Sequence, residues 1–247
     1  MNTDHDQRIC EFEEKPKAPK SNKASMGVYV FTWQVLKRYL IEDDGDSKSS
    51  HDFGKNIIPD MLSDNRNIYA YGFSGYWKDV GTTESLWQSN MDLLESPPVF
   101  DLYNPSWKIY GRNQNQPSHF IAPTAGVKRA IVCEGSVIYG NVYHSVISTG
   151  AFVDEGAVIR DSIIMPYVRV ERGSLIESSI IAEGAVVGEN CTIGEHASGE
   201  DPSKYLTVVA ENVMIPPRTV IGKGESVDGA ALNEIIKRNG SAESEGA

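Results

Sequence analysis

The chain has 247 residues, which is enough for one large domain or two modest ones and excludes a peptide or a disulfide mini-scaffold. Asp and Glu number 34 against 23 Lys and Arg, so the formal charge is −11, and 40% of the residues are hydrophobic. This composition excludes a disordered chain and a general nucleic-acid binder. An anionic substrate must therefore be held by a few local cations or backbone amides.

The cysteines and the hydropathy pattern restrict the cellular setting. Cys10, Cys133 and Cys191 are odd in number and stand in no Cys/His spacing, so neither a disulfide framework nor a zinc site is expected. No apolar run approaches the roughly 18 residues that span a bilayer, and the polar, acidic first residues differ from a secretory signal. We expect a soluble cytoplasmic protein that binds neither membrane nor nucleic acid.

Residues 1–95 alternate between strand-like and helix-like patterns. The predicted elements, in chain order, are a buried strand over Gly27–Phe31, a helix capped by Thr32 and continuing to Leu40, a helix from Ser50 or His51 through Met61, a strand over Ile68–Phe73, and a helix from Thr82 or Thr83 to Leu94. Such alternation suggests an α/β layer. Two strands, however, are too few to close that kind of sheet.

A different pattern follows a linker at 96–120, which is rich in Pro, Asn and aromatic residues. Apolar residues then recur at six-residue steps, in one row at Val146, Phe152, Val158, Ile164, Val170 and Ile176, and in others at Ile147, Val153, Ile159 and Met165 and at Ile181, Val187 and Ile193. Glycines punctuate these rows, as a turn after each short strand requires. This pattern predicts a hexapeptide parallel β-helix over 121–222, because a β-sandwich would show two-residue alternation and hairpin turns instead. The order weakens after Gly194, and 223–247 is a C-terminal tail whose last residues, 241–247, are expected to be disordered.

Three clusters could carry chemistry. Glu11–Pro16 places a lysine between a carboxylate and a proline-stiffened turn, which suits either a sugar-phosphate contact or a solvated charged edge. Ser25–Gly27 suits either a close ligand approach or a plain turn before a strand. Tyr76–Thr82 carries Asp79, which is either a Mg²⁺ ligand at the end of a strand or a cap for the next turn.

Together these phrases resemble bacterial glucose-1-phosphate adenylyltransferase. The resemblance rests on Glu13–Pro16, Ala24–Phe31, Ser50–Lys55 and Tyr76–Thr82, which stand in that family's order and precede hexapeptide repeats. It implies the C-terminal part of a Rossmann-like nucleotidyltransferase domain over 1–95, of α/β class, followed by a left-handed parallel β-helix.

The resemblance also implies an activity and its residues. In that family glucose 1-phosphate attacks the α-phosphorus of ATP with Mg²⁺, and ADP-glucose forms for glycogen synthesis. Carried over by position, Lys15 would hold the sugar phosphate, Glu14 would accept from glucose hydroxyls, Ser25 would line the sugar site, and Asp79 would hold Mg²⁺. Such a site acts by positioning and charge neutralisation.

One departure from the family pattern is large. Met1 aligns with the middle of the catalytic domain, so the Gly-rich ATP loop of the nucleotide-binding half has no counterpart here. We therefore expect a C-terminal fragment that retains no catalytic residue, does not make ADP-glucose alone, and uses ATP only where the missing half is supplied.

Other functions stay open at this point. Because the family contains regulatory subunits with degenerate sites, the chain could be a non-catalytic assembly subunit, and the resemblance implies a homotetramer or a hetero-oligomer with a related subunit. Lys128, Arg129 and Arg169 could line an effector site or a solvated face. Hexapeptide acyltransferases use a histidine base, for which His144 and His196 are the candidates.

Overall fold

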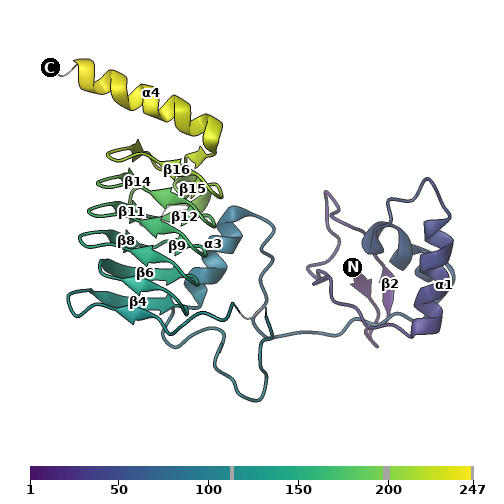
Figure 1. Cartoon of the computed structure of the whole chain (residues 1–247). Coiled ribbons are helices and arrows are strands. Elements are labelled where there is room, and N and C mark those ends of the chain that lie inside the picture. Colours follow the sequence, from purple (N-terminus) through teal and green to yellow (C-terminus); the bar gives the residue numbers. More distant parts are fainter. Residues whose placement is uncertain (112–113, 197–200, 246–247) are drawn as a thin grey trace. The chain divides into compact units, whose positions relative to one another are not determined.

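The computed structural model describes residues 1–111, 114–196 and 201–245, with side chains described through Asn239 in its last helix. The chain forms two compact units, Met1–Gly75 and Tyr76–Ala247 (Figure 1). No helix in the described part is both long and apolar enough to cross a membrane.

The first unit is small and mostly helical. Strands β1 (Asn2–Thr3) and β2 (Ile9–Glu11) pair antiparallel, and they are followed by α1 (Trp33–Asp44), a π-helical turn η1 (Phe53–Ile57) and α2 (Ile58–Ser63). Its buried cluster consists of Tyr39, Ile57 and Met61, with partly buried neighbours from α1 and from Phe31 and Phe53. The predicted helix after Thr32 is confirmed, and Gly45 is its C-cap.

Both strands predicted in this unit are wrong. Gly27–Phe31 forms no strand, and its Val28 and Val30 side chains are 75% and 97% exposed. Ile68–Phe73 makes only an isolated bridge between Tyr69 and Arg8. An apolar run becomes a strand only where a neighbour satisfies its backbone groups, and the described residues of this unit place no strand beside Gly27–Phe31. The next predicted helix begins later than expected, because Asp52 rather than Ser50 or His51 is its N-cap.

The second unit begins with α3 (Thr83–Asp92), whose Thr82 and Ser85 form a capping box, as the sequence predicted for this helix start. The β-helix then follows. Its strands are β3 (Phe120–Ile121), β4 (Val127–Val132), β5 (Val137–Ile138), β6 (Asn141–Ile147), β7 (Phe152–Val153), β8 (Val158–Arg160), β9 (Ile163–Ile164), β10 (Arg169–Val170), β11 (Leu175–Glu177), β12 (Ser179–Ile181), β13 (Val186–Val187), β14 (Thr192–Ile193), β15 (Thr207–Val209), β16 (Met214–Ile215), β17 (Val220–Ile221) and β18 (Ser226–Val227). All of their pairings are parallel, which confirms the predicted β-helix.

The register of the β-helix refines the predicted period. Ile176 pairs with Ile159 and Ile193, so a regular turn here takes 17 residues rather than 18. A strict six-residue row therefore drifts around the helix: Val146 lies in the cluster beneath α3, whereas Ile176 lies on the axis. The axis is filled by fully buried aliphatic side chains such as Ile159, Ile176 and Ile193.

The order does not end at Gly194. A longer connection, which includes the 3-10 turn η2 (Pro202–Lys204), leads into four more strands, β15 to β18. The helix α4 (Gly229–Glu245) follows at the end of the β-helix (Figure 1). Its Leu232 and Ile235 side chains belong to the axial core. Residues 241–245 are thus helical rather than disordered, and residues 246 and 247 lie outside the described part.

The second unit has another buried core besides the axial one, at the place where α3 packs onto the β-helix. Met91 and Leu94 are buried against outward-facing side chains of stacked strands, among them Val146, Ile163 and Ile180. The sequence placed residues 76–95 with the first domain, and the contacts of the structure group them with the β-helix.

Candidate functional site

The first candidate cluster is the turn after β2. Lys15 has a φ of +48°, and its Nζ lies 3.8 Å from Oε1 of Glu14. The Lys15 side chain is 91% exposed, whereas that of Glu14 is only 30% exposed. The lysine is therefore free to meet an anion, and the carboxylate is held against the protein.

The surface that holds Glu14 is the backbone of Gly54 in η1. A Cβ on Gly54 would lie 2.6 Å from Oε2 of Glu14 and 3.3 Å from a ring carbon of Phe12. Distances below 3.0 Å are not tolerated, so only glycine lets the carboxylate approach this closely. Gly54 lies in one of the motifs that carry the family resemblance, but no sequence pattern predicted this contact.

An open depression beside Gly54 carries several cations. Glu14, Lys17 and Lys55 are among its lining residues. Within the described part of the chain, the Lys17 and Lys55 ammonium groups have no ion-pair partner, whereas Lys20 pairs with Glu11. The hydrogen bond between Lys20 and Glu11 raises the pKa of Lys20. The same bond and a second hydrogen bond, donated by Asn2, lower the pKa of Glu11. Glu13 and Glu14 line the same depression, so two carboxylates balance the two unpaired ammonium groups, and each lysine offers only a local cation to a phosphate.

Ser25 lies in another segment of the chain and is connected to η1 through Tyr29. Its Oγ lies 3.0 Å from the Tyr29 hydroxyl and accepts from the amide of Gly27 at 3.1 Å. The ring of Tyr29 in turn stacks on Phe53, with 5.7 Å between centroids and 17° between planes. Glu14 thus contacts Gly54, and Ser25 is linked through Tyr29 to Phe53, the residue before it. The structure brings together two of the three clusters that the sequence singled out.

Asp79 belongs to the second unit. Its Oδ1 accepts from the amide of Gly81 at 3.1 Å, which is the local turn that the sequence offered as the alternative to a metal ligand. The loop is tied to α3, because the Tyr76 hydroxyl and Lys78 Nζ both donate to Oδ2 of Asp92, at 2.9 and 2.6 Å. Burial and the bond to Asp92 raise the pKa of Tyr76.

The fit of a divalent metal at Asp79 can be tested against the surrounding carboxylates. Across residues 1–111, 114–196 and 201–245, no three His, Cys, Asp or Glu side chains are arranged to hold a metal ion. One carboxylate that already accepts a backbone amide does not make a Mg²⁺ site, which takes several oxygen ligands. The described residues around Asp79 therefore do not complete a metal site.

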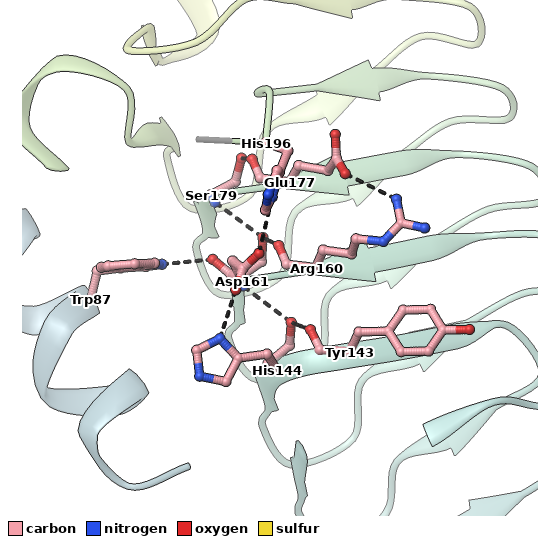
Figure 2. Close-up of polar contacts among 10 residues, drawn as sticks. Trp87, Tyr143, His144, Arg160, Asp161, Glu177, Ser179 and His196 are labelled. Atoms are coloured by element: carbon pink, nitrogen blue, oxygen red, sulfur yellow. Dashed lines mark hydrogen bonds and ion pairs between the residues drawn. The ribbon is translucent and has the colours of Figure 1, made fainter. Parts of the chain in front are cut away.

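His144 and His196, the candidate acyltransfer bases, converge on one carboxylate (Figure 2). Nδ1 of His144 lies 2.6 Å from Oδ1 of Asp161, and Nδ1 of His196 lies 3.4 Å from Oδ2. Trp87 of α3 donates to the backbone oxygen of Asp161 at 2.7 Å. The other ring nitrogen of His144 is buried and has no hydrogen-bond partner among the described residues. This nitrogen cannot reach a substrate in solvent, so His144 and Asp161 form a structural joint between α3 and the corner of the β-helix, whereas the His196 side chain is 60% exposed.

Comparison with known proteins finds two families along the chain, and the first match extends beyond Gly75 to residue 96. Residues 1–96 match the nucleotidyl transferase family, and residues 117–215 match the GlmU-like C-terminal hexapeptide family. The chain is 50% identical over 234 residues to a protein from Acetivibrio thermocellus named glucose-1-phosphate adenylyltransferase, covering 92% of this chain and 55% of that protein. Proteins of the same name from Desulforamulus reducens and Clostridium acetobutylicum are 46% and 54% identical over 233 and 159 residues. These alignments cover 94% and 64% of this chain and 58% and 42% of the two relatives. The chain spans about half the length of the curated relatives it matches.

Proposed function

Because this chain is homologous to glucose-1-phosphate adenylyltransferases over most of its length, we propose that it is the sugar-phosphate-binding and β-helical part of such an enzyme. The proposed reaction of the whole protein is ATP + α-D-glucose 1-phosphate = ADP-glucose + diphosphate, in glycogen biosynthesis. The observation that carries the proposal is the meeting of Glu14 and the Ser25–Tyr29 pair at Phe53–Gly54, beside unpaired lysines.

The chain's own residues have distinct proposed roles. Lys15 is exposed and binds the sugar phosphate as a point charge, with Lys17 and Lys55 contributing to the local field. Glu14 has a carboxylate that lies against Gly54 and accepts from glucose hydroxyls. Ser25 lines the sugar site. These groups bind and orient the substrate and perform no covalent chemistry themselves.

The metal, the nucleotide and the assembly belong to the whole protein. We assign Asp79 to a Mg²⁺ site that needs further ligands, and a bound cation would supply charge neutralisation at the reacting phosphates. ATP binding is assigned to the part of the relatives' length that this chain does not span. We further propose a homotetramer or a hetero-oligomer with a related subunit, and a cytoplasmic location, where both substrates are formed.

Calorimetric titration of the purified chain with glucose 1-phosphate tests the proposal. We expect saturable heat for the wild type and loss of that heat in Lys15→Ala, because the phosphate then loses its main cation. Lys37→Ala removes another exposed lysine, from α1, and is the matched control that should bind normally. Absence of heat in wild type and variant alike would contradict sugar-phosphate binding and favour a non-catalytic assembly subunit.

A further inference from the structure

A carboxylate outside the proposed site anchors the loop that leads into it. Asp43 stands in the last turn of α1, and its side chain is only 8% exposed. One of its oxygens accepts from the hydroxyl of Ser49, and the other lies 2.8 Å from Nδ1 of His51. The Ser49 hydroxyl also accepts from the amide of His51 at 3.0 Å. Asp43 therefore fixes both ends of the tripeptide from Ser49 to His51.

The anchored loop continues directly into η1. His51 has a φ of +54°, a strained conformation for a residue with a side chain, and it needs contacts to maintain it. Asp52 then accepts from the amides of Gly54 and Lys55, at 2.8 and 2.9 Å. These bonds set the backbone of Phe53 and Gly54, which is the surface that Glu14 and Tyr29 contact.

We propose that Asp43 and His51 are positioning residues for the sugar-phosphate site, acting through the loop from Ser49 to Gly54. The inference rests on the proposed function, because it concerns that same site. Neither residue lines the depression that contains Glu14 and Lys55; both line a separate one on another side of Phe53. They hold the site's surface in place without contacting the ligand.

The charge state of His51 connects this anchor to pH. The hydrogen bond that Asp43 accepts from His51 raises the pKa of His51 above its ordinary 6.5, and the nearby carboxylates of Asp44 and Asp46 raise it further. Ser49 and His51 in turn lower the pKa of Asp43 below 3.8. A group whose folded pKa is raised contributes fully below its unfolded pKa and loses that contribution as pH rises through the folded pKa. The anchor is thus strongest between about pH 4 and 6.5 and weakens at higher pH, where a neutral imidazole makes a weaker bond.

The test measures glucose 1-phosphate affinity against pH in the whole chain. At pH 6 we expect Asp43→Asn to bind about tenfold more weakly than wild type, because a charge-assisted anchor is lost and the loop must be ordered by the ligand. Asp44→Asn removes the same charge from the neighbouring residue, which makes no hydrogen bond to His51, and should bind within about twofold of wild type. Circular dichroism establishes that each variant is folded.

A second pair of variants isolates the titration. The side-chain amide of His51→Gln donates to Asp43 at any pH, so its affinity should stay within about threefold of wild type at pH 6 and should not decline relative to wild type at pH 8. His5→Gln removes another exposed histidine that pairs only with a neighbouring aspartate, and should keep the wild-type profile. Titration of the ligand's own phosphate is common to wild type and all four variants and cancels in the comparison.

The outcomes separate this inference from the function on which it rests. If wild type binds and Asp43→Asn binds equally well, or if His51→Gln keeps the full pH dependence, the positioning role is refuted and the proposed function stands. If wild type does not bind glucose 1-phosphate, the proposed function fails and the inference fails with it.

Discussion

Substitution of Gly54 by alanine tests how the site holds its carboxylate. The new Cβ would lie 2.6 Å from Oε2 of Glu14, and ordinary contact begins at 3.4 Å, so the carboxylate must retreat by roughly 0.8 Å. Because the clashing atom ends a flexible side chain, the displacement falls on Glu14 rather than on the fold. Alanine also favours helix over glycine by up to about 1 kcal/mol, which offsets any strain in η1.

The expected result is weak binding in a stable protein. A hydrogen bond to a charged group contributes about 1.5–3 kcal/mol, and 1.4 kcal/mol is a factor of ten in affinity. We therefore expect Gly54→Ala to bind glucose 1-phosphate at least about tenfold more weakly by calorimetry, with a melting temperature close to that of wild type. Gly72→Ala is the matched control, because a Cβ there meets nothing within 4 Å and its φ is not positive. Unchanged affinity in Gly54→Ala would refute the role given to Glu14, and a large drop in melting temperature would refute the assumption that Glu14 moves freely.

Three further predictions concern the second unit. Gly194→Ala should destabilise the β-helix by several kcal/mol in urea, because its Cβ would lie 2.1 Å from a backbone oxygen. Gly156→Ala has a similar φ, but its Cβ would make only ordinary contacts, at 3.6 Å or more, so it should cost only about 1–2 kcal/mol. Trp87→Phe should lower stability by about 1 kcal/mol in thermal unfolding, because it removes the bond to the backbone of Asp161 and keeps the aromatic packing; no change would show that this bond contributes nothing. Burial raises the pKa of Cys191, so this thiol should react with a maleimide far more slowly than the exposed Cys10, as peptide mass spectrometry would measure; equal rates would contradict the burial.

The sequence predicted the β-helix better than the first unit, for a physical reason. Every turn of the β-helix repeats the same contacts with its neighbours, so its signal accumulates along the chain. Even there the strict six-residue step was off by one residue in each regular turn, because the 17-residue register of Ile159, Ile176 and Ile193 is set by stacking between turns. The strand predicted at Gly27–Phe31 failed because a single apolar run specifies no pairing partner.

For the site, the sequence identified Glu14, Lys15 and Ser25 as candidates but could not order them. Their meeting depends on Phe53 and Gly54, about forty residues after Glu14, and no local pattern links the two segments. Asp43 could not be singled out from the sequence, because nothing in the sequence shows that this carboxylate is shielded from water while its neighbour Asp44 is exposed.

Gly54 nevertheless carried a signal that could have been used. It stands in a helical turn, where glycine is less favourable than alanine by about 0.8–1.0 kcal/mol, and its φ is not positive, so backbone geometry does not require it. A glycine that is unfavourable locally and unnecessary for the backbone is explained by close approach of another group. In the structure that group is the carboxylate of Glu14, and the anchor at Asp43 keeps the helical turn where this approach is possible. Gly54 and Asp43 therefore belong to one arrangement. Glycine at position 54 lowers helix stability, and the arrangement in return positions the charged Glu14 side chain for binding.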